Sequence, residues 1–235
     1  MTLSMKRIYA IFQKDIKDLS KNMFVSSIIV LPLLMAFMYS RMGVNIELHY
    51  LIINLTLASV TLFIQCAVIA EEKEKHTLRG LMLSPATLPE ILTGKSLVTL
   101  ILTLVTIVVC TKITGYDPAN LLLVFIAIFI SSLFYLALGT LLGLVTKTVV
   151  EASVVILPFM FLFGFGSMLQ PLIDEYPLLV FVDYLPNTQL VEFAYKVEEG
   201  LAFGNLWSHL TIILAWGVVS AILTFFVYRK REMDE

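Results

Sequence analysis

Six long apolar runs constrain this chain more than any other feature of its sequence. They are Met23–Ser40, Tyr50–Ala70, Ser96–Thr114, Asn120–Val145, Ala152–Gln170 and Leu206–Tyr228. A helix needs about 20 apolar residues to cross the hydrocarbon core of a bilayer. The composition agrees, because 59% of the residues are hydrophobic and only 14% are charged. We therefore expect an all-α, polytopic membrane protein with six transmembrane helices in a single domain over residues 1–235.

The distribution of basic residues predicts the orientation of these spans. Six spans place both termini on one side, and cytoplasmic segments are enriched in Lys and Arg. With the termini inside, thirteen of the 16 basic residues are inner: Lys6, Arg7, Lys14, Lys17, Lys21, Lys73, Lys75, Arg79, Lys95, Lys147, Arg229, Lys230 and Arg231. The other three are Arg41, Lys112 and Lys196. We therefore expect cytoplasmic termini and a place in the plasma (inner) membrane.

The segment before the first apolar run is amphipathic. Its apolar positions are Ile8, Ile11, Phe12, Ile16 and Leu19, at helical spacing, while basic and acidic residues fill the other face. The pattern predicts an interfacial helix within residues 1–22. Two roles remain open for it: an anchor on the membrane surface, or a helix that also contacts a partner protein.

The inner loop at residues 71–95 combines charge with a short apolar stretch. Glu71 to Lys75 read as a charged extension of the second span into water. The stretch that follows carries Thr77, Leu78, Leu81, Met82 and Leu83. It should turn at Ser84-Pro85, because the residue before a proline disfavours helix, and a second helix should begin between Thr87 and Glu90. A short, partly apolar helix suits docking into a groove on another protein, whereas the alternative is an ordinary solvated loop.

The outer segment at residues 171–205 is acidic and contains apolar patches. It is too short, and too interrupted by Pro177, Asp183 and Pro186, to cross a bilayer. Irregular backbone at membrane depth is tolerated only when it is packed against protein. The segment therefore predicts a re-entrant or interfacial hairpin on the extracellular side.

The triplet Gly94-Lys95-Ser96 is the ending of the phosphate-binding loop of many ATPases. In that loop a glycine stands five residues before the second glycine, but here the position is Pro89. Proline has no N–H to offer a phosphate and cannot adopt a positive φ. No buried strand precedes the triplet either, so we expect ATP to bind elsewhere than on this chain and Lys95 to mark the membrane boundary.

Polar side chains in the second run form a candidate substrate surface. Asn54, Thr61 and Gln65 share one helix face with Ala58. Polar groups in hydrocarbon need partners, so this face should look into the protein. It could line a substrate cavity, or it could serve only in hydrogen bonds between helices.

The later runs contain two further packing features. Phe159 and Phe163 follow Pro158, where we expect a kink, and they either line the same cavity or simply pack. Gly139 and Gly143 form a G-x-x-x-G pair in the fourth run, which predicts close packing against another helix.

Taken together, the amphipathic start, the inner loop and the outer segment resemble the permease subunits of ABC type-2 exporters. The matching positions of the inner loop are Glu71, Glu72, Glu74, Thr77-Leu78, Leu81, Leu83, Ser84-Pro85, Glu90 and Gly94-Lys95. The outer stretch Tyr184 to Gly200 resembles the family's proline-containing segment, although the order here is Pro186-Asn187-Thr188 and Lys196 stands nearest to an expected arginine. The resemblance covers nearly the whole chain.

The resemblance implies a coupling role for the inner loop. It makes residues 1–22 a connecting helix and Thr77 to Leu83 a coupling helix. Contacts to an ATPase would involve Glu72, Thr77, Leu78, Leu81, Ser84 and Pro85. The substrate cavity would include Asn54, Thr61, Gln65, Phe159 and Phe163. The implied complex has two ATPase subunits, which hold ATP and Mg, and two permease chains as a homodimer or a heterodimer.

Other classes of function fit less well. The chain has no H-E-x-x-H or G-x-S-x-G motif, its three histidines are scattered, and its two cysteines lie inside apolar runs, so we expect neither catalysis nor a metal site. No basic tract suggests nucleic acid as a partner. An ATP-independent secondary transporter or channel is the main alternative, although such carriers usually need charges at midspan. The cavity residues suit an amphiphilic drug, a peptide or a lipid-like molecule, and the small outer segment favours a bacterial or archaeal permease.

Overall fold

The computed structural model describes residues 4–21, 23–43, 45–75, 88–173, 175–200, 204 and 206–234. The helices are α1 (Met5–Lys21), α2 (Met23–Tyr39), α3 (Ile46–Thr56), η1 (Leu57–Phe63), α4 (Ile64–Glu74), α6 (Leu88–Thr114), α7 (Leu121–Val145), α8 (Val149–Val155), α9 (Leu157–Phe165), η2 (Gly166–Leu172), η3 (Pro177–Tyr184), α10 (Pro186–Glu198) and α11 (Trp207–Asp234). No strand occurs within these described ranges, so the predicted all-α class is confirmed.

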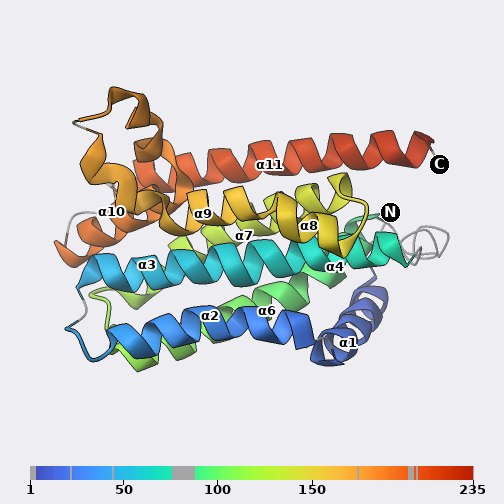
Figure 1. The fold of residues 1–235 in the computed structure, drawn as a ribbon, viewed down its shortest axis with the longest axis horizontal. Helices are drawn as coiled ribbons and strands as arrows, with labels where there is room; N and C mark the ends of the chain where they lie inside the picture. Colours follow the sequence, from blue (N-terminus) through green and yellow to red (C-terminus); the bar gives the residue numbers. More distant parts are fainter. Residues whose placement is uncertain are drawn as a thin grey trace.

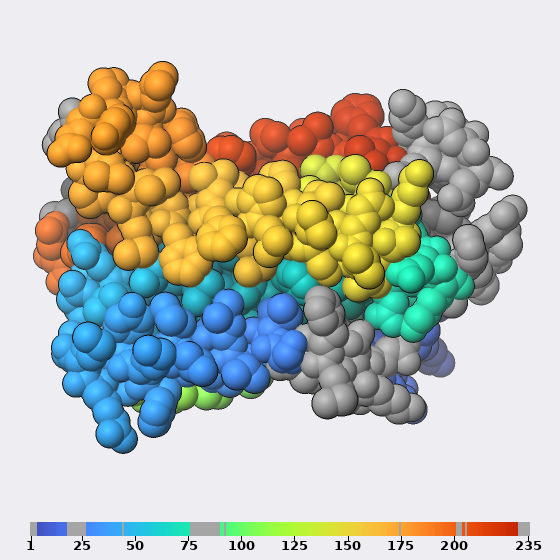
Figure 2. Space-filling view, viewed as in Figure 1, coloured from blue at the N-terminus to red at the C-terminus, as the bar shows by residue number. Residues whose placement is uncertain are grey.

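The long helices lie side by side in one bundle (Figure 1). One end of the bundle, called here the α1 end, carries α1 and the C-terminal ends of α4 and α11. The opposite end, called here the α10 end, carries η3 and α10 (Figures 1 and 2). This arrangement puts the amphipathic helix and the predicted extracellular segment at opposite ends of the molecule.

Helices α3, η1 and α4 form one continuous rod at the centre of the bundle. Residues 46–74 make a 29-residue span whose most apolar stretch is wholly buried inside the chain. The central part, η1, is a π-helix. Side-chain hydroxyls compete for backbone carbonyls here, because Thr56 donates to the oxygen of Ile52 and Ser59 donates to that of Leu55. Such back-bonding and the wider π turn both change which way side chains face along the rod.

Among the described residues, the structure has four or five candidate spans, whereas the sequence predicts six. In the part of the chain that the structure describes, four helices are long and apolar enough to cross a bilayer: residues 46–74, 93–114, 121–145 and 207–229. The helices α8 and α9–η2 meet at a bend of 41°. If this bent pair is counted as one span, it is the fifth. The bend confirms the kink expected at Pro158, which is the second residue of α9.

The first predicted span, Met23–Ser40, corresponds to α2. This helix has 17 residues, which give a length of about 26 Å, short of the roughly 30 Å hydrocarbon core. The count of six spans therefore stays a prediction.

Two other predicted segments have helical structure. The helix expected to begin between Thr87 and Glu90 begins at Leu88 and continues into the third span. The outer segment forms η3 and α10, and α10 packs against α3, α7 and α11. Whether this segment enters the membrane as a re-entrant hairpin stays a prediction.

Candidate functional site

The predicted coupling residues fall in two places. Thr77, Leu78, Leu81, Ser84 and Pro85 lie in residues 76–87, outside the described residues. Glu72 lies near the end of α4 and is only 7% exposed. The structure therefore describes both ends of the inner loop, and each end carries a buried charged side chain, Glu72 and Lys95.

A buried ion cluster joins α1, α4 and α6 at the α1 end. Lys95 of α6 is 1% exposed. Its Nζ donates to Oε1 of Glu72 at 2.8 Å and lies 3.3 Å from Oδ2 of Asp15 on α1. Lys14 of α1 donates to the same Glu72 oxygen at 2.6 Å. One carboxylate thus ties together two lysines from two different helices.

The charges in this cluster depend on one another. Burial raises the pKa of the Asp15 carboxyl, while the nearby Lys95 ammonium lowers it and Glu72 raises it further. With all four groups ionised, the two carboxylates balance the two lysines. Removing one member of a buried pair typically costs about 3–5 kcal/mol, because it leaves an uncompensated charge in a medium of low dielectric constant. The cluster therefore fixes the relative positions of three helices.

A second ion pair fastens the start of α1 to α6. Glu90 is fully buried and accepts two hydrogen bonds from the Arg7 guanidinium, at 2.9 Å from Nε and 2.7 Å from Nη2. The backbone N–H of Ser4 donates to the same carboxylate at 2.6 Å. Bidentate pairing of this kind sets orientation as well as distance.

Between the two ion pairs, α1 and α6 are in close contact at Gly94. A Cβ added to Gly94 would lie 2.9 Å from Cβ of Ile11 and 3.1 Å from the carbonyl oxygen of Ile8. The triplet Gly94-Lys95-Ser96 lies inside α6 and not in a loop between a strand and a helix. Here the glycine allows α1 to approach, and the lysine is a buried counter-ion.

The end of α4 also contacts the turn between α7 and α8. Lys73 donates to the carbonyl oxygen of Leu144 at 2.6 Å and to that of Thr146, where α7 ends. Glu74 accepts from the backbone N–H of Val149, the first residue of α8, at 2.8 Å. A cation at a helix C-terminus and an anion at a helix N-terminus both complement the helix dipole.

These contacts correct the prediction for Glu71 to Lys75 at Glu72, whereas Glu74 and Lys75 are exposed as the sequence predicts. The sequence indicates a charged extension into water, but Glu72 is buried, and Lys73 and Glu74 hold neighbouring helices. The physical reason is that α1 and α6 cover this end of α4 and provide charges opposite in sign to its own. Lys95 lies close to the start of the span at residues 93–114, so its place at a membrane boundary stays a prediction, but its side chain is buried in the protein. We call Asp15, Glu72, Lys73, Glu74 and Lys95 the hub.

The predicted cavity residues of the second run are fully buried within the one chain. Nδ2 of Asn54 donates to the carbonyl oxygen of Asn187 on α10, at 3.2 Å. The hydroxyls of Thr61 and Thr103 are 2.8 Å apart. The first contact faces α10 and the second faces α6, so the expected single face is divided along the rod.

Gln65 makes the most extensive polar contacts of this set. Its Nε2 donates to the hydroxyls of Ser96 and Thr140, at 3.2 Å and 3.0 Å, and its Oε1 accepts from Thr99 at 2.9 Å. Gln65 therefore links the central rod to α6 and α7 together. In this conformation these side chains form hydrogen bonds between helices of the same chain. A role in substrate binding stays a prediction.

The predicted aromatic residues lie in the core on the other side of the rod. The Phe163 ring is 5.2 Å from that of Phe134 and 6.1 Å from that of Trp216, edge to face. Phe159 is half-buried and packs against the same core. A place in the substrate cavity is likewise still a prediction for both residues.

A profile of ABC-2 family transporter proteins matches residues 18–226. The chain belongs to the ABC-2 transporter family. The match includes α2 to α10 and most of α11, with both ends of the inner loop. Members of this family are membrane-spanning subunits of ABC-type transport systems and are not themselves catalytic. No curated protein shows a significant match to the chain.

Membership has direct consequences for the site. This ABC-2 chain is a transport permease embedded in a membrane. Within the described residues, no three His, Cys, Asp or Glu side chains lie close enough together to hold a metal ion. The location of ATP and Mg on a partner remains a prediction.

One sequence signal points to Asp15 as a member of the hub: its position on the apolar face of α1. Ile8, Ile11 and Asp15 follow one another at helical spacing, and all three are buried, whereas Ile16 is 43% exposed. An acid on the buried stripe of an amphipathic helix predicts a buried cation opposite it. That signal, combined with Lys95, could have identified the cluster.

Proposed function

We propose that this chain is the permease subunit of an ATP-driven exporter that moves an amphiphilic drug, peptide or lipid-like molecule out of the cell. Two copies of a separate ATPase subunit, carrying ATP and Mg, would drive a pair of permease chains, either identical or different. Family membership supports the transport role, and the hub supports the coupling role.

The observation that carries the proposal is the pairing of the two ends of the inner loop. Glu72 precedes residues 76–87, Lys95 follows them, and the two side chains are joined at 2.8 Å. Asp15 and Lys14 attach α1 to the same pair. A force applied to residues 76–87 therefore reaches α1, α4 and α6 together, as it would if a docked ATPase moved this loop as a rigid body.

Further contacts would carry such a movement across the bundle. Lys73 and Glu74 connect the hub to the α7–α8 turn, and Gln65 connects the central rod to α6 and α7. Polar bonds thus link the rod to α1, α6, α7 and α8 at this end. ATP energy can favour export only if the two conformations of the bundle hold substrate differently.

We further propose which side of the membrane each end of the bundle faces and which role each segment has. The α1 end is cytoplasmic, residues 1–22 are the connecting helix, residues 71–95 are the coupling loop, and residues 171–205 are extracellular. The ATPase contacts are Glu72, Thr77, Leu78, Leu81, Ser84 and Pro85. When the helices separate, the freed cavity surface comprises Asn54, Thr61, Gln65, Phe159 and Phe163.

Site-specific photo-crosslinking tests the coupling loop directly. We expect a benzophenone amino acid at position 81 to form a covalent adduct with an ATPase subunit in native membranes, because this position belongs to the proposed docking helix. The matched control is position 42, since Met42 is 73% exposed and follows α2 near the α10 end. Equal adducts from both positions, or an adduct from position 42 alone, would overturn the assignment of the loop.

A further inference from the structure

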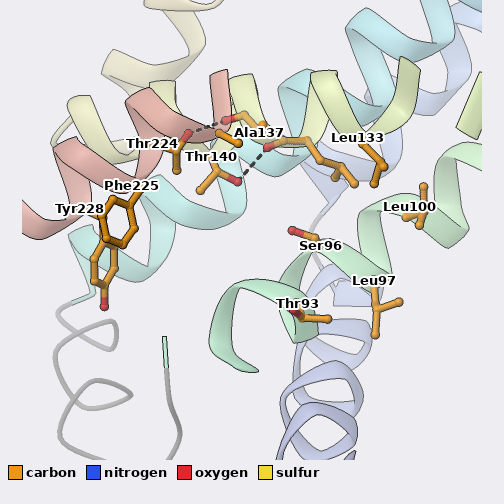
Figure 3. Close-up of a pocket in the computed structure, with 12 residues that line it drawn as sticks. Thr93, Ser96, Leu97, Leu100, Leu133, Ala137, Thr140, Thr224, Phe225 and Tyr228 are labelled. Carbon is orange, nitrogen blue, oxygen red and sulfur yellow. Dashed lines mark hydrogen bonds between the residues drawn. The ribbon is translucent and has the colours of Figure 1, made fainter. Parts of the chain in front are cut away.

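A hollow of about 440 Å³ lies between α6 and the α7–α11 pair. Leu97 and Leu100 of α6 face Leu133 of α7 and Phe225 of α11 across it (Figure 3). It forms because α7 packs closely along α11, whereas α6 packs mainly on α1 and α2. The volume is within the range of about 300–1,000 Å³ that ligand pockets occupy.

The floor of the hollow offers few free polar groups. The Thr140 hydroxyl donates to the carbonyl oxygen of Leu136, and the Thr224 hydroxyl donates to that of Ala137 (Figure 3). Thr140 also accepts from Gln65, as does Ser96. A polar ligand group placed here would lose its water and gain little in return, so the hollow fits a hydrocarbon chain.

The hollow opens sideways and not into the centre of the bundle. Leu133 and Phe225, which line it, are 44% and 54% exposed. They continue into apolar exposed surfaces on the same helices, such as Phe129 and Ile222. In a membrane protein these surfaces meet lipid, so an acyl chain reaches the hollow without crossing water.

The end of the hollow has a basic neighbour. Tyr228 lines it near the α1 end, and the next residue, the exposed Arg229, begins the basic run Arg229-Lys230-Arg231. Basic residues at such a boundary attract anionic lipid headgroups, each with about 1 kcal/mol. We propose that the hollow holds one acyl chain of an anionic phospholipid from the leaflet at the α1 end, with its headgroup beside Arg229.

Occupation by lipid would bear on the proposed coupling pathway. Ser96 and Thr140 line the hollow on opposite sides, and both are bonded to Gln65. An acyl chain between α6 and α7 would therefore set how far these helices separate. The lipid site itself does not depend on export or on an ATPase, so it can fail or succeed independently of the proposed function.

Photoreactive lipid tests this inference. The full chain is placed in nanodiscs that contain phosphatidylcholine and a small fraction of phosphatidylglycerol with a diazirine on one acyl chain. We expect cross-linked peptides to concentrate on the hollow-lining parts of α6, α7 and α11. Ala221→Phe should fill the opening and lower this yield by about tenfold or more, since each displaced methylene group loses about 0.8 kcal/mol.

The controls separate a bound lipid from the general lipid annulus. Ala215→Phe makes the same change on an exposed face of α11 outside the hollow, and it should leave the yield unchanged. Arg229→Gln should lower the preference for phosphatidylglycerol over phosphatidylcholine by about fivefold. Uniform labelling of all exposed apolar faces, equal effects of the two Phe variants, or cross-links between two chains at this surface would each overturn the proposal.

Discussion

Lys95→Met is expected to destabilise the chain by about 3–5 kcal/mol. Methionine keeps much of the length of the side chain but leaves Asp15 without its nearest cation and leaves Glu72 with Lys14, which is 42% exposed. For a chain of this length, such a loss corresponds to a fall in melting temperature of roughly 6–20 °C. Thermal unfolding of the purified chain in mild detergent measures it.

Two further variants show whether the loss comes from the buried charge. Lys75→Met removes a lysine from an exposed pair with Glu71, and its effect should stay within about 0.5 kcal/mol. Adding Asp15→Asn to Lys95→Met removes the uncompensated carboxylate and should restore part of the stability. If Lys95→Met melts like Lys75→Met, the hub is solvated and the account of it is wrong.

Gly143→Ala is expected to have the second large effect. A Cβ at Gly143 would lie 2.7 Å from the carbonyl oxygen of Cys66 and 2.7 Å from Cβ of Ile69. Backbone cannot give way as a flexible side chain can, so α7 would have to move away from α4. Overpacking of this kind costs about 1–3 kcal/mol, and we expect the upper part of that range here.

The same substitution at another helical glycine provides the control. A Cβ at Gly217 of α11 would lie 3.8 Å from Phe134, which is ordinary contact. Gly217→Ala should therefore be neutral or gain up to about 1 kcal/mol from better helix propensity. Equal melting temperatures for the two alanine variants would show that α7 and α4 are not packed as described. The close helix packing predicted from the G-x-x-x-G pair would then be wrong as well.

Much of the fold could be predicted from the sequence because hydrophobicity and helix period are local signals. The apolar runs locate the long helices, the pattern of Ile8 and Ile11 predicts α1, and Pro158 predicts the bend between α8 and α9. The short α2 shows the limit of this reasoning, since the apolar run locates the helix but does not establish that it spans a bilayer.

The candidate site was less accessible to sequence reasoning because its chemistry depends on distant partners. Asp15 and Lys95 are 80 residues apart and meet only when α1 packs on α6. Glu72 looks like one acid among several, although its neighbours bury it. The residues of the second run were correctly assigned to buried positions, but the π turn in η1 and the partners on α6 and α10 could not be read from their spacing.

We propose that an ATPase subunit drives this permease through its inner loop. The most direct measurement purifies the tagged chain from its native membrane in mild detergent and assays the eluate for ATPase activity and subunit ratio. We predict a stoichiometric ATPase partner that is lost with Leu81→Asp and retained with Leu81→Met, since only the charged side chain disrupts apolar docking. A chain that elutes without ATPase activity, or an ATPase that stays bound to Leu81→Asp, would contradict the account.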